Sequence, residues 1–306
     1  MRKTYHLCLA SHDEVMHRSE EDYIYDVNCM AVAISRTESR GLADSVMSTH
    51  DHLCVQSDDI RGLCYVRRNA YTRYFNAKYG RKGRLGEKDH FISEINGIRH
   101  ITAAISYVNR NPLHHGVSPT PFGYKFCSAN AVFQKALGKE CAASFLSPCS
   151  RYRTLPSNVV LTPSYRMDRS GMVLHEDFLD IRYVEEIYVS PRSFLYMMNR
   201  YSDEKWIMEQ QEEESTATPV TLENMEYGYS TEDIRRMKSN ETGRIDLSAL
   251  SDIQLCKEID TYYVPKSSCH SVYGLSETQK QHIGNELWRK YRRRTTEKQI
   301  RRCLVL

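Results

Sequence analysis

The sequence lacks any apolar run long enough to cross a membrane. Its 306 residues are 41% hydrophobic, and no stretch approaches the roughly 18 to 20 apolar residues that a spanning helix needs. The first residues are basic but reach His12-Asp13-Glu14 before an apolar core of about seven residues forms, so they do not match a secretory signal. We therefore expect a cytoplasmic protein without a membrane partner, with room for two domains.

Closely spaced cysteines are also missing. The chain has ten cysteines, and no two of them lie at the short spacing of a zinc knuckle. We interpret them as reduced thiols that mostly fill the core as small apolar side chains. This interpretation argues against both a disulfide framework and a cysteine-based zinc site.

A strong net charge is absent, although charges are unevenly placed. The 42 basic and 39 acidic residues leave a net charge of +3, but from Arg61 to Lys88 nine basic residues meet the single acid Glu87. Tyrosines lie between them, and this mixture suits single-stranded or structured nucleic acid, because basic groups bind phosphates and aromatic rings stack on unpaired bases. A solvated helix with a tyrosine-rich inner face is the alternative. The predicted DNA contacts are Arg67, Arg68, Arg73, Tyr74, Lys78, Arg81, Lys82 and Arg84.

Two domains are predicted. Residues 1–150 mix short strands with helices, whereas residues 151–306 are mainly helical and have no assigned role, with nucleic-acid and protein binding both open. Ser190, which precedes a proline, is typical of a helix N-cap, and Ser276 with Gln279 forms a capping box.

A second basic block runs from Arg289 to Arg302 and has eight basic residues against Glu297. It is either a basic amphipathic helix packed on its domain or a direct nucleic-acid contact. The sequence leaves these two interpretations open.

His50 and His52 are the first candidate metal ligands. In a strand from Val46 to Gln56 they share one face, with Asp51 on the other. Two imidazoles one pleat apart can reach a single divalent ion. The motif alone is weak, because roughly half a His-x-His is expected by chance at this histidine content.

A predicted helix from Glu94 to Asn109 supplies the second part of the candidate site. Its isoleucines and Val108 fall on one stripe, and Pro112 is expected to end the helix. Tyr107 lies about 140° from the centre of that stripe, so we expect it to be exposed, with Asn111 one turn later. A surface tyrosine without a role is the alternative.

Several motifs follow one another in roughly the first 135 residues. They are His50-Asp-His52, Tyr71-Thr-Arg-Tyr-Phe-Asn76 with Arg81-Lys-Gly83, Ser106-Tyr-Val-Asn-Arg-Asn-Pro112, and Gly116-Val117. Their order resembles that of the single-tyrosine HUH transposases. The branch that looks most similar is the REP-associated tyrosine transposases, whose tyrosine motif reads Tyr-hydrophobic-x-x-Asn-Pro.

The resemblance implies a fold, a site and an activity. The fold is a ferredoxin-like α+β HUH domain with an antiparallel sheet, followed here by the mainly α-helical domain. His50, His52 and Asn111 would hold Mg²⁺ or Mn²⁺, and Tyr107 would attack a DNA phosphodiester, giving a 5′-phosphotyrosine and a free 3′-OH. The implied function is cleavage and strand transfer of single-stranded or hairpin DNA by a metal-dependent transposase or endonuclease, as a monomer or a dimer.

Two residues depart from the family pattern. Asp51 stands where the family has a hydrophobic residue that packs under the sheet. It either stays in contact with water, contributes to the metal site, or indicates that the metal site has diverged from that of the family. Gly86 stands where the family usually has Trp, so a stacking or packing contact is expected to be lost. A non-catalytic, domesticated nucleic-acid-binding protein of the same fold is therefore the alternative function.

Overall fold

A four-stranded antiparallel sheet organises the first part of the chain in the computed structural model. The strand order β2-β3-β1-β4, with a helix after β1 and another after β3, is the predicted ferredoxin-like arrangement. The elements are β1 (Lys3–Ala10), α1 (Glu20–Arg36), β2 (Arg40–Val46), β3 (His50–Ser57), α2 (Ile60–Tyr79), β4 (Phe91–Ile95) and α3 (Ile98–His114). The structure describes residues 2–138, 154–156, 159, 161–162, 164–200, 204–213, 216–226, 229–241, 246 and 248–306.

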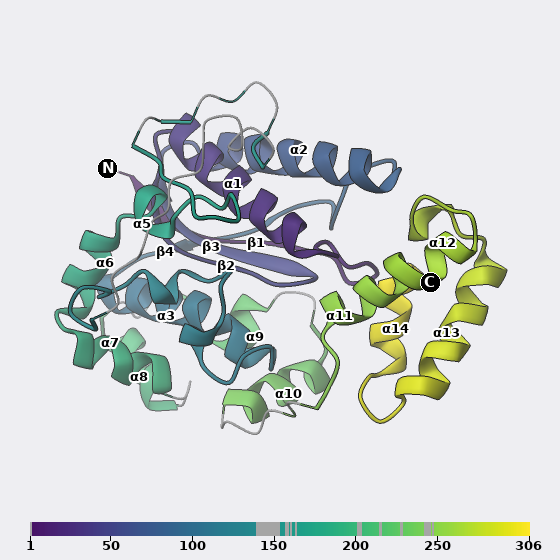
Figure 1. The fold of residues 1–306 in the computed structure, drawn as a ribbon. Helices are drawn as coiled ribbons and strands as arrows, with labels where there is room; N and C mark the ends of the chain where they lie inside the picture. Colours follow the sequence, from purple (N-terminus) through teal and green to yellow (C-terminus); the bar gives the residue numbers. More distant parts are fainter. Residues whose placement is uncertain are drawn as a thin grey trace.

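The two faces of the sheet are covered by different helices. Figure 1 shows α1 and α2 together on one face and α3 on the other. Strand β3 alternates as predicted, because His50 and His52 turn toward α3 whereas Leu53 and Val55 join the apolar cluster under α1. The α+β fold class predicted from the sequence is confirmed.

The predicted strand from Val46 to Gln56 is instead the end of one strand and the whole of another. Strand β2 ends at Val46, and the chain turns so that Met47 N donates to His50 O at 2.7 Å. The turn places His50 at the start of β3, opposite Ala10 of β1.

The helix predicted from Glu94 to Asn109 differs at both ends. Its first residues, Glu94 and Ile95, belong to β4. Gly97 adopts a φ of 88°, which a right-handed helix cannot contain, so α3 begins only at Ile98. At the other end, α3 continues through Pro112 to His114. A proline in the last turn removes a single intrahelical hydrogen bond. His114, the last residue of the helix, is buried against Glu241, at 2.7 Å between Nε2 and Oε1.

The described part of the second half is helical, as predicted. Both predicted N-termini are confirmed: Ser190 Oγ accepts from Ser193 N at 3.2 Å, and Ser276 forms a capping box with Gln279. Short 3₁₀ segments span Pro121–Gly123, Ser128–Asn130 and Val272–Gly274, and a π-helical turn spans Ile259–Tyr263. The α-helices are α5 (His175–Phe178), α6 (Ile181–Tyr188), α7 (Pro191–Asn199), α8 (Glu204–Glu213), α9 (Leu222–Met225), α10 (Thr231–Glu241), α11 (Asp252–Glu258), α12 (Val264–Lys266), α13 (Glu277–Tyr291) and α14 (Glu297–Leu304).

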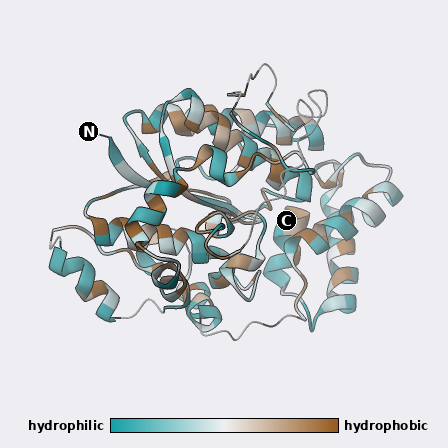
Figure 2. Ribbon diagram, turned by 60° about the vertical axis from the view of Figure 1, so that its left-hand side comes forward, coloured by the Kyte–Doolittle hydropathy of each residue, from teal (hydrophilic) through white to brown (hydrophobic). Residues whose placement is uncertain are grey.

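Helix α3 is enclosed between the sheet and helices of the second half. One apolar cluster joins Cys54 and Ile105 to Val184, Phe194 and Leu222. Figure 2 shows apolar positions recurring along the helices beside the sheet, with polar positions between them. The expected boundary near residue 150 lies in 139–153, outside the described residues, so the division into two domains stays a prediction.

Helices α11–α14 gather at one end of the molecule, beyond the tip of the β2–β3 turn (Figure 1). They surround an apolar cluster of their own, which includes Leu255, Ile259, Ile283 and Leu287 together with Val15 from the N-terminal part. We call residues 251–306 the C-terminal helical unit.

Two further sequence expectations concern cysteines and membranes. Eight cysteines lie among the described residues, all of them unpaired and all but Cys269 buried, as predicted, whereas Cys141 and Cys149 lie outside these residues. Within the described part of the chain, no helix combines the length and apolar character needed to span a membrane.

Candidate active site

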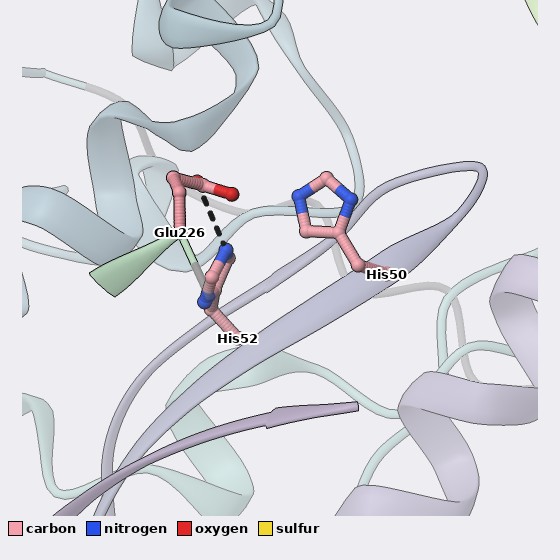
Figure 3. A group of neighbouring side chains, drawn as sticks. All are labelled: His50, His52 and Glu226. Carbon is pink, nitrogen blue, oxygen red and sulfur yellow. Dashed lines mark ion pairs between the residues drawn. The ribbon is translucent and has the colours of Figure 1, made fainter. Parts of the chain in front are cut away.

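His50 and His52 project from the same face of β3 into a buried cluster (Figure 3). His50 Nε2 lies 3.2 Å from Asn111 Oδ1 of α3, and His50 Nδ1 is 3.0 Å from the Tyr229 hydroxyl. Burial lowers the pKa of His50 well below its usual value, and the nearby His115 lowers it further. The ring is therefore held neutral, with a lone pair that can bind a cation.

His52 is oriented by a third histidine. His6 of β1 places Nε2 2.9 Å from His52 Nδ1, and the two rings stack with centroids 5.0 Å apart. Burial lowers the pKa of His6 well below its usual value, which keeps it neutral beside His52. If His52 Nδ1–H donates to His6, the Nε2 lone pair of His52 faces the cluster, as in metal sites where a neighbour fixes the ligand tautomer.

Tyr107 reaches the same cluster from α3, but it is buried instead of exposed. Its side chain packs edge-on against the rings of His6 and His52, at 5.8 and 5.3 Å between centroids, and the residue is only 4% exposed. The expected exposure is wrong because α3 is covered by the sheet on one side and by second-half helices on the other. Burial also raises the pKa of Tyr107 well above its usual value, and the Glu226 carboxylate raises it further.

Glu226, which follows α9, completes the cluster. Its Oε1 accepts hydrogen bonds from the Tyr107 hydroxyl and from Asn111 Nδ2, the latter at 3.1 Å. The same oxygen lies 3.3 Å from His115 Nε2 and 3.4 Å from His52 Nε2. The dashed line in Figure 3 marks the pair of Glu226 with His52. Burial would raise the pKa of Glu226, but the charge and hydrogen bond of His115, together with His52, hold it well below the usual value.

The donor set of His50, His52 and Glu226 fits a divalent cation. One ligand atom from each residue lies within 4.8 Å of the others. Around an octahedral Mg²⁺, opposite ligands are about 4.2 Å apart and adjacent ligands about 3 Å apart, so the three side chains would have to move closer together to bind an ion. His52 Nε2 and Glu226 Oε2 are buried without a hydrogen-bond partner, so both atoms are available to a cation.

Asp51 faces away from this cluster, and it is neither exposed to solvent nor one of the candidate metal ligands. It is fully buried, and its Oδ1 accepts from Arg67 at 2.6 Å. Arg67 also binds Asp26 at 2.7 Å, and Asp26 in turn lies 2.8 Å from His17 Nε2. The structure thus replaces the expected apolar contact under the sheet with a buried ion-pair network.

Arg67 belongs to that network and is 2% exposed, which corrects its predicted role as a DNA contact. Three further predicted contacts also hold the fold. Lys78 binds Asp22 at 2.7 Å, Arg81 binds Glu14 at 2.5 Å, and Arg68 donates to backbone carbonyls of residues 85–88.

The remaining predicted contacts differ in exposure. Tyr74 is half-buried, stacks on Tyr25 with ring centroids 3.8 Å apart and donates to Asp22. Arg73, Lys82 and Arg84 are exposed, and their contact with DNA stays a prediction.

Gly86 has a local reason to lack a side chain. Its φ is 74°, and a Cβ there would lie 3.0 Å from the carbonyl oxygen of Ala10. The next residue, Glu87, donates its backbone N–H to the same oxygen at 2.7 Å. A tryptophan at position 86 would separate this loop from the end of β1.

Sequence reasoning found His50, His52, Tyr107 and Asn111, and the structure brings all four together. It missed Glu226, as well as the surrounding His6, His115 and Tyr229. His115 follows Asn111 by one helical turn, so its position was a usable signal. Glu226 is 119 residues from Tyr107 in sequence and had no such signal.

Comparisons with known proteins find little relatedness. No family model matches the sequence, and no curated protein matches it. A solved structure of a REP-associated tyrosine transposase bound to a REP hairpin is similar over 46% of this chain and 84% of that chain, with a TM-score of 0.38 and 15% identity. This is a distant structural relationship, and it does not assign the chain to a family.

Proposed function

We propose that this protein cleaves and rejoins single-stranded DNA beside hairpins, with Tyr107 as the nucleophile. His50, His52 and Glu226 would hold Mg²⁺ or Mn²⁺, and Asn111 would act beside them. The main supporting observation is that one carboxylate, Glu226, contacts both the Tyr107 hydroxyl and the His52 imidazole. The ordered motifs from residue 50 to residue 117 support the same reaction.

The proposed chemistry needs a nucleophile and stabilisation of the phosphate charge. The bound cation would polarise the scissile phosphate. The Tyr107 oxygen would attack phosphorus and give up its proton to water, the bond from phosphorus to the 3′ oxygen would break, and that oxygen would take up a proton from water as the free 3′-OH. The phosphotyrosine keeps the energy of the broken ester, so a second 3′-OH can reverse the step without ATP.

Glu226 controls the proton on the nucleophile. Because the pKa of Tyr107 is raised and that of Glu226 is lowered, the proton stays on the phenol in this structure. If Glu226 held a cation, the carboxylate charge that raises the pKa of Tyr107 would be offset, and the phenol would lose its proton more readily.

DNA reaches Tyr107 only after part of the site opens. The phenol is 4% exposed, and Glu226 and Tyr229 lie over the face of β3 that carries the histidines. Access for a phosphate would therefore require the Glu226 and Tyr229 side chains to move away from this face. Asn240 Nδ2 donates to His114 O at 2.9 Å and joins α10 to the end of α3.

The same burial favours the second candidate function, a binding protein without catalysis. In that protein Glu226 would close the site permanently, and only the exposed basic side chains would contact nucleic acid. The two functions differ in whether Tyr107 becomes attached to DNA.

A covalent-adduct assay tests the proposal. Protein and Mn²⁺ are incubated with a hairpin-flanked single strand labelled at its 3′ end, and the products are separated on a denaturing gel. We expect labelled DNA attached to the wild-type protein and none attached to Tyr107→Phe, which retains hairpin affinity. Glu226→Gln should weaken Mn²⁺ binding in calorimetry and reduce the adduct.

The matched control is Tyr65→Phe, which changes an exposed tyrosine outside the cluster and should leave the adduct unchanged. Mn²⁺ binding at the histidines without any adduct would establish the binding-only function instead.

A further inference from the structure

The C-terminal end of α13 carries an exposed tryptophan among arginines. Trp288 is 41% exposed, and Arg289, Arg292 and Arg293, which follow it closely in sequence, are exposed as well. Residues three and four apart on a helix share a face, so Trp288 and Arg289 lie next to Arg292. We call these four residues the α13 patch.

Most other basic side chains of this block hold the C-terminal helical unit in place. Lys290 binds Glu258 at 2.8 Å, and Arg302 binds Asp252 at 2.7 Å. Lys298 reaches Asp233 of α10 at 3.0 Å, and Arg294 donates to Ser248 O at 2.7 Å. These four basic residues therefore have a structural role.

The arginines of the α13 patch have no such role. Within the described residues, Arg289, Arg292 and Arg293 form neither an ion pair nor a side-chain hydrogen bond with the rest of the chain. Cations at a helix C-terminus interact favourably with its carbonyl groups, which explains a basic residue there. That interaction does not explain why a large apolar ring is left in water beside three guanidinium groups.

We infer that the α13 patch is a binding site for a single-stranded nucleic-acid segment. The arginines would contact successive backbone phosphates, and the indole of Trp288 would stack on an unpaired base. The tryptophan favours a single strand over a duplex, because a paired base does not offer its face to a side chain from outside the helix.

This site lies apart from the cluster around Tyr107 and goes beyond the proposed reaction. It belongs to the helical unit with its own apolar cluster, whereas Tyr107 belongs to the cluster that includes Ile105. Contact between Lys298 and α10 places the unit beside the helix that follows Glu226 and Tyr229. A single nucleic-acid strand bound to the α13 patch would thus be held on the same molecule as the cluster around Tyr107.

Tryptophan fluorescence tests this inference directly. The sequence has two tryptophans, and Trp206 is only 5% exposed, so quenching by an added strand reports mainly on Trp288. The probe is a dT oligonucleotide of about 12 nucleotides, within the usual range of site sizes. We expect saturable quenching of the full-length protein that Trp288→Ala abolishes, while binding, measured by fluorescence anisotropy, weakens on the order of tenfold.

The arginines are tested by the triple variant R289Q/R292Q/R293Q. Its affinity for the oligonucleotide should fall at least about tenfold, and the slope of log affinity against log salt should decrease by about 2, since a single strand contributes about 0.7 per phosphate contact. The matched control R192Q/K205Q/R235Q removes the same charge from exposed positions on α7, α8 and α10 and should keep the wild-type affinity and quenching.

Further arms separate this site from the others. Tyr107→Phe should quench like the wild type, so failure of the proposed reaction leaves this result unaffected. Equal affinity for a duplex without quenching, or equal loss of affinity in the control triple variant, would overturn the inference. Quenching by anionic lipid vesicles but not by the oligonucleotide would overturn it in favour of a membrane surface. Circular dichroism melting verifies that each variant is folded.

Discussion

The two faces of β3 are equally buried but use polar groups in opposite ways. On one face, Asp51 meets Arg67 in a direct ion pair at 2.6 Å. On the other face, His52 Nε2 approaches Glu226 Oε1 only to 3.4 Å and has no hydrogen-bond partner of its own. Neighbouring residues of one strand thus belong to a paired network and to an open cluster.

Buried polar groups thus stabilise the fold on one face of β3 and form a candidate binding site on the other. The Arg67 guanidinium lies between Asp26 and Asp51 and pairs with both carboxylates, although Asp51 Oδ2 has no hydrogen-bond partner. In the cluster of His50, His52 and Glu226, by contrast, one ligand atom from each residue lies within 4.8 Å of the others, and no lysine or arginine of the described residues lies between them. A buried polar atom without a partner destabilises the fold, and a bound ion would satisfy His52 Nε2 and Glu226 Oε2.

Breaking the network should have the largest effect on stability. Arg67→Met leaves Asp26 and Asp51 buried without their shared cation, and we expect the free energy of unfolding to fall by about 3–5 kcal/mol. Asp51→Leu, which leaves Arg67 paired with Asp26, should cost less. Urea unfolding of both variants measures the difference. An equal loss in the two variants would show that Asp51 alone, and not the network, stabilises this face.

Filling the open cluster should have the next largest effect. Mn²⁺ at 100 times its dissociation constant should raise the free energy of unfolding by about 2.7 kcal/mol. The increase should vanish in His50→Ala and persist in Asp51→Asn, which changes the other face of the same strand. Thermal melts with and without the ion make the comparison, and loss of the increase in Asp51→Asn would contradict the division of β3 into two faces.

Acid should weaken the network face through Asp26. Burial would raise the pKa of this carboxyl, but Arg67 and His17 outweigh it and hold the pKa below its usual value. A depressed carboxyl pKa stabilises the folded protein above about pH 4 and loses that contribution as the pH falls through the folded value. Asp26→Asn should cost about 2 kcal/mol at pH 7 and flatten the stability loss below pH 4, as measured by urea unfolding at several pH values.

The smallest stability effect is expected on the exposed loop before β4. Lys82→Gln with Arg84→Gln should change the free energy of unfolding by less than about 0.5 kcal/mol, because both side chains are exposed. Affinity for hairpin DNA should nevertheless fall, and so should its salt dependence. Unchanged affinity at 50 mM salt would remove this loop from the DNA-binding surface.

Local sequence patterns were sufficient for much of the fold. The alternation around His50 and His52 predicted their shared face, and the caps at Ser190 and Ser276 predicted two helix starts. Such patterns act between residues that are close in sequence, so they are readable without the rest of the chain. Local reading failed at Gly97, where a positive φ separates a strand from a helix whose isoleucines continue the same spacing.

The sequence by itself determined that His50 and His52 share one face of a strand and that Tyr107 lies on a helix, with Asn111 one turn later. Only the tertiary structure decided that Tyr107 is buried, that Asp51 pairs with Arg67, and that Glu226 enters the cluster. These outcomes depend on which distant segments exclude water from a given side chain. Glu226 meets Tyr107 across 119 residues of sequence, and no spacing rule acts over that separation.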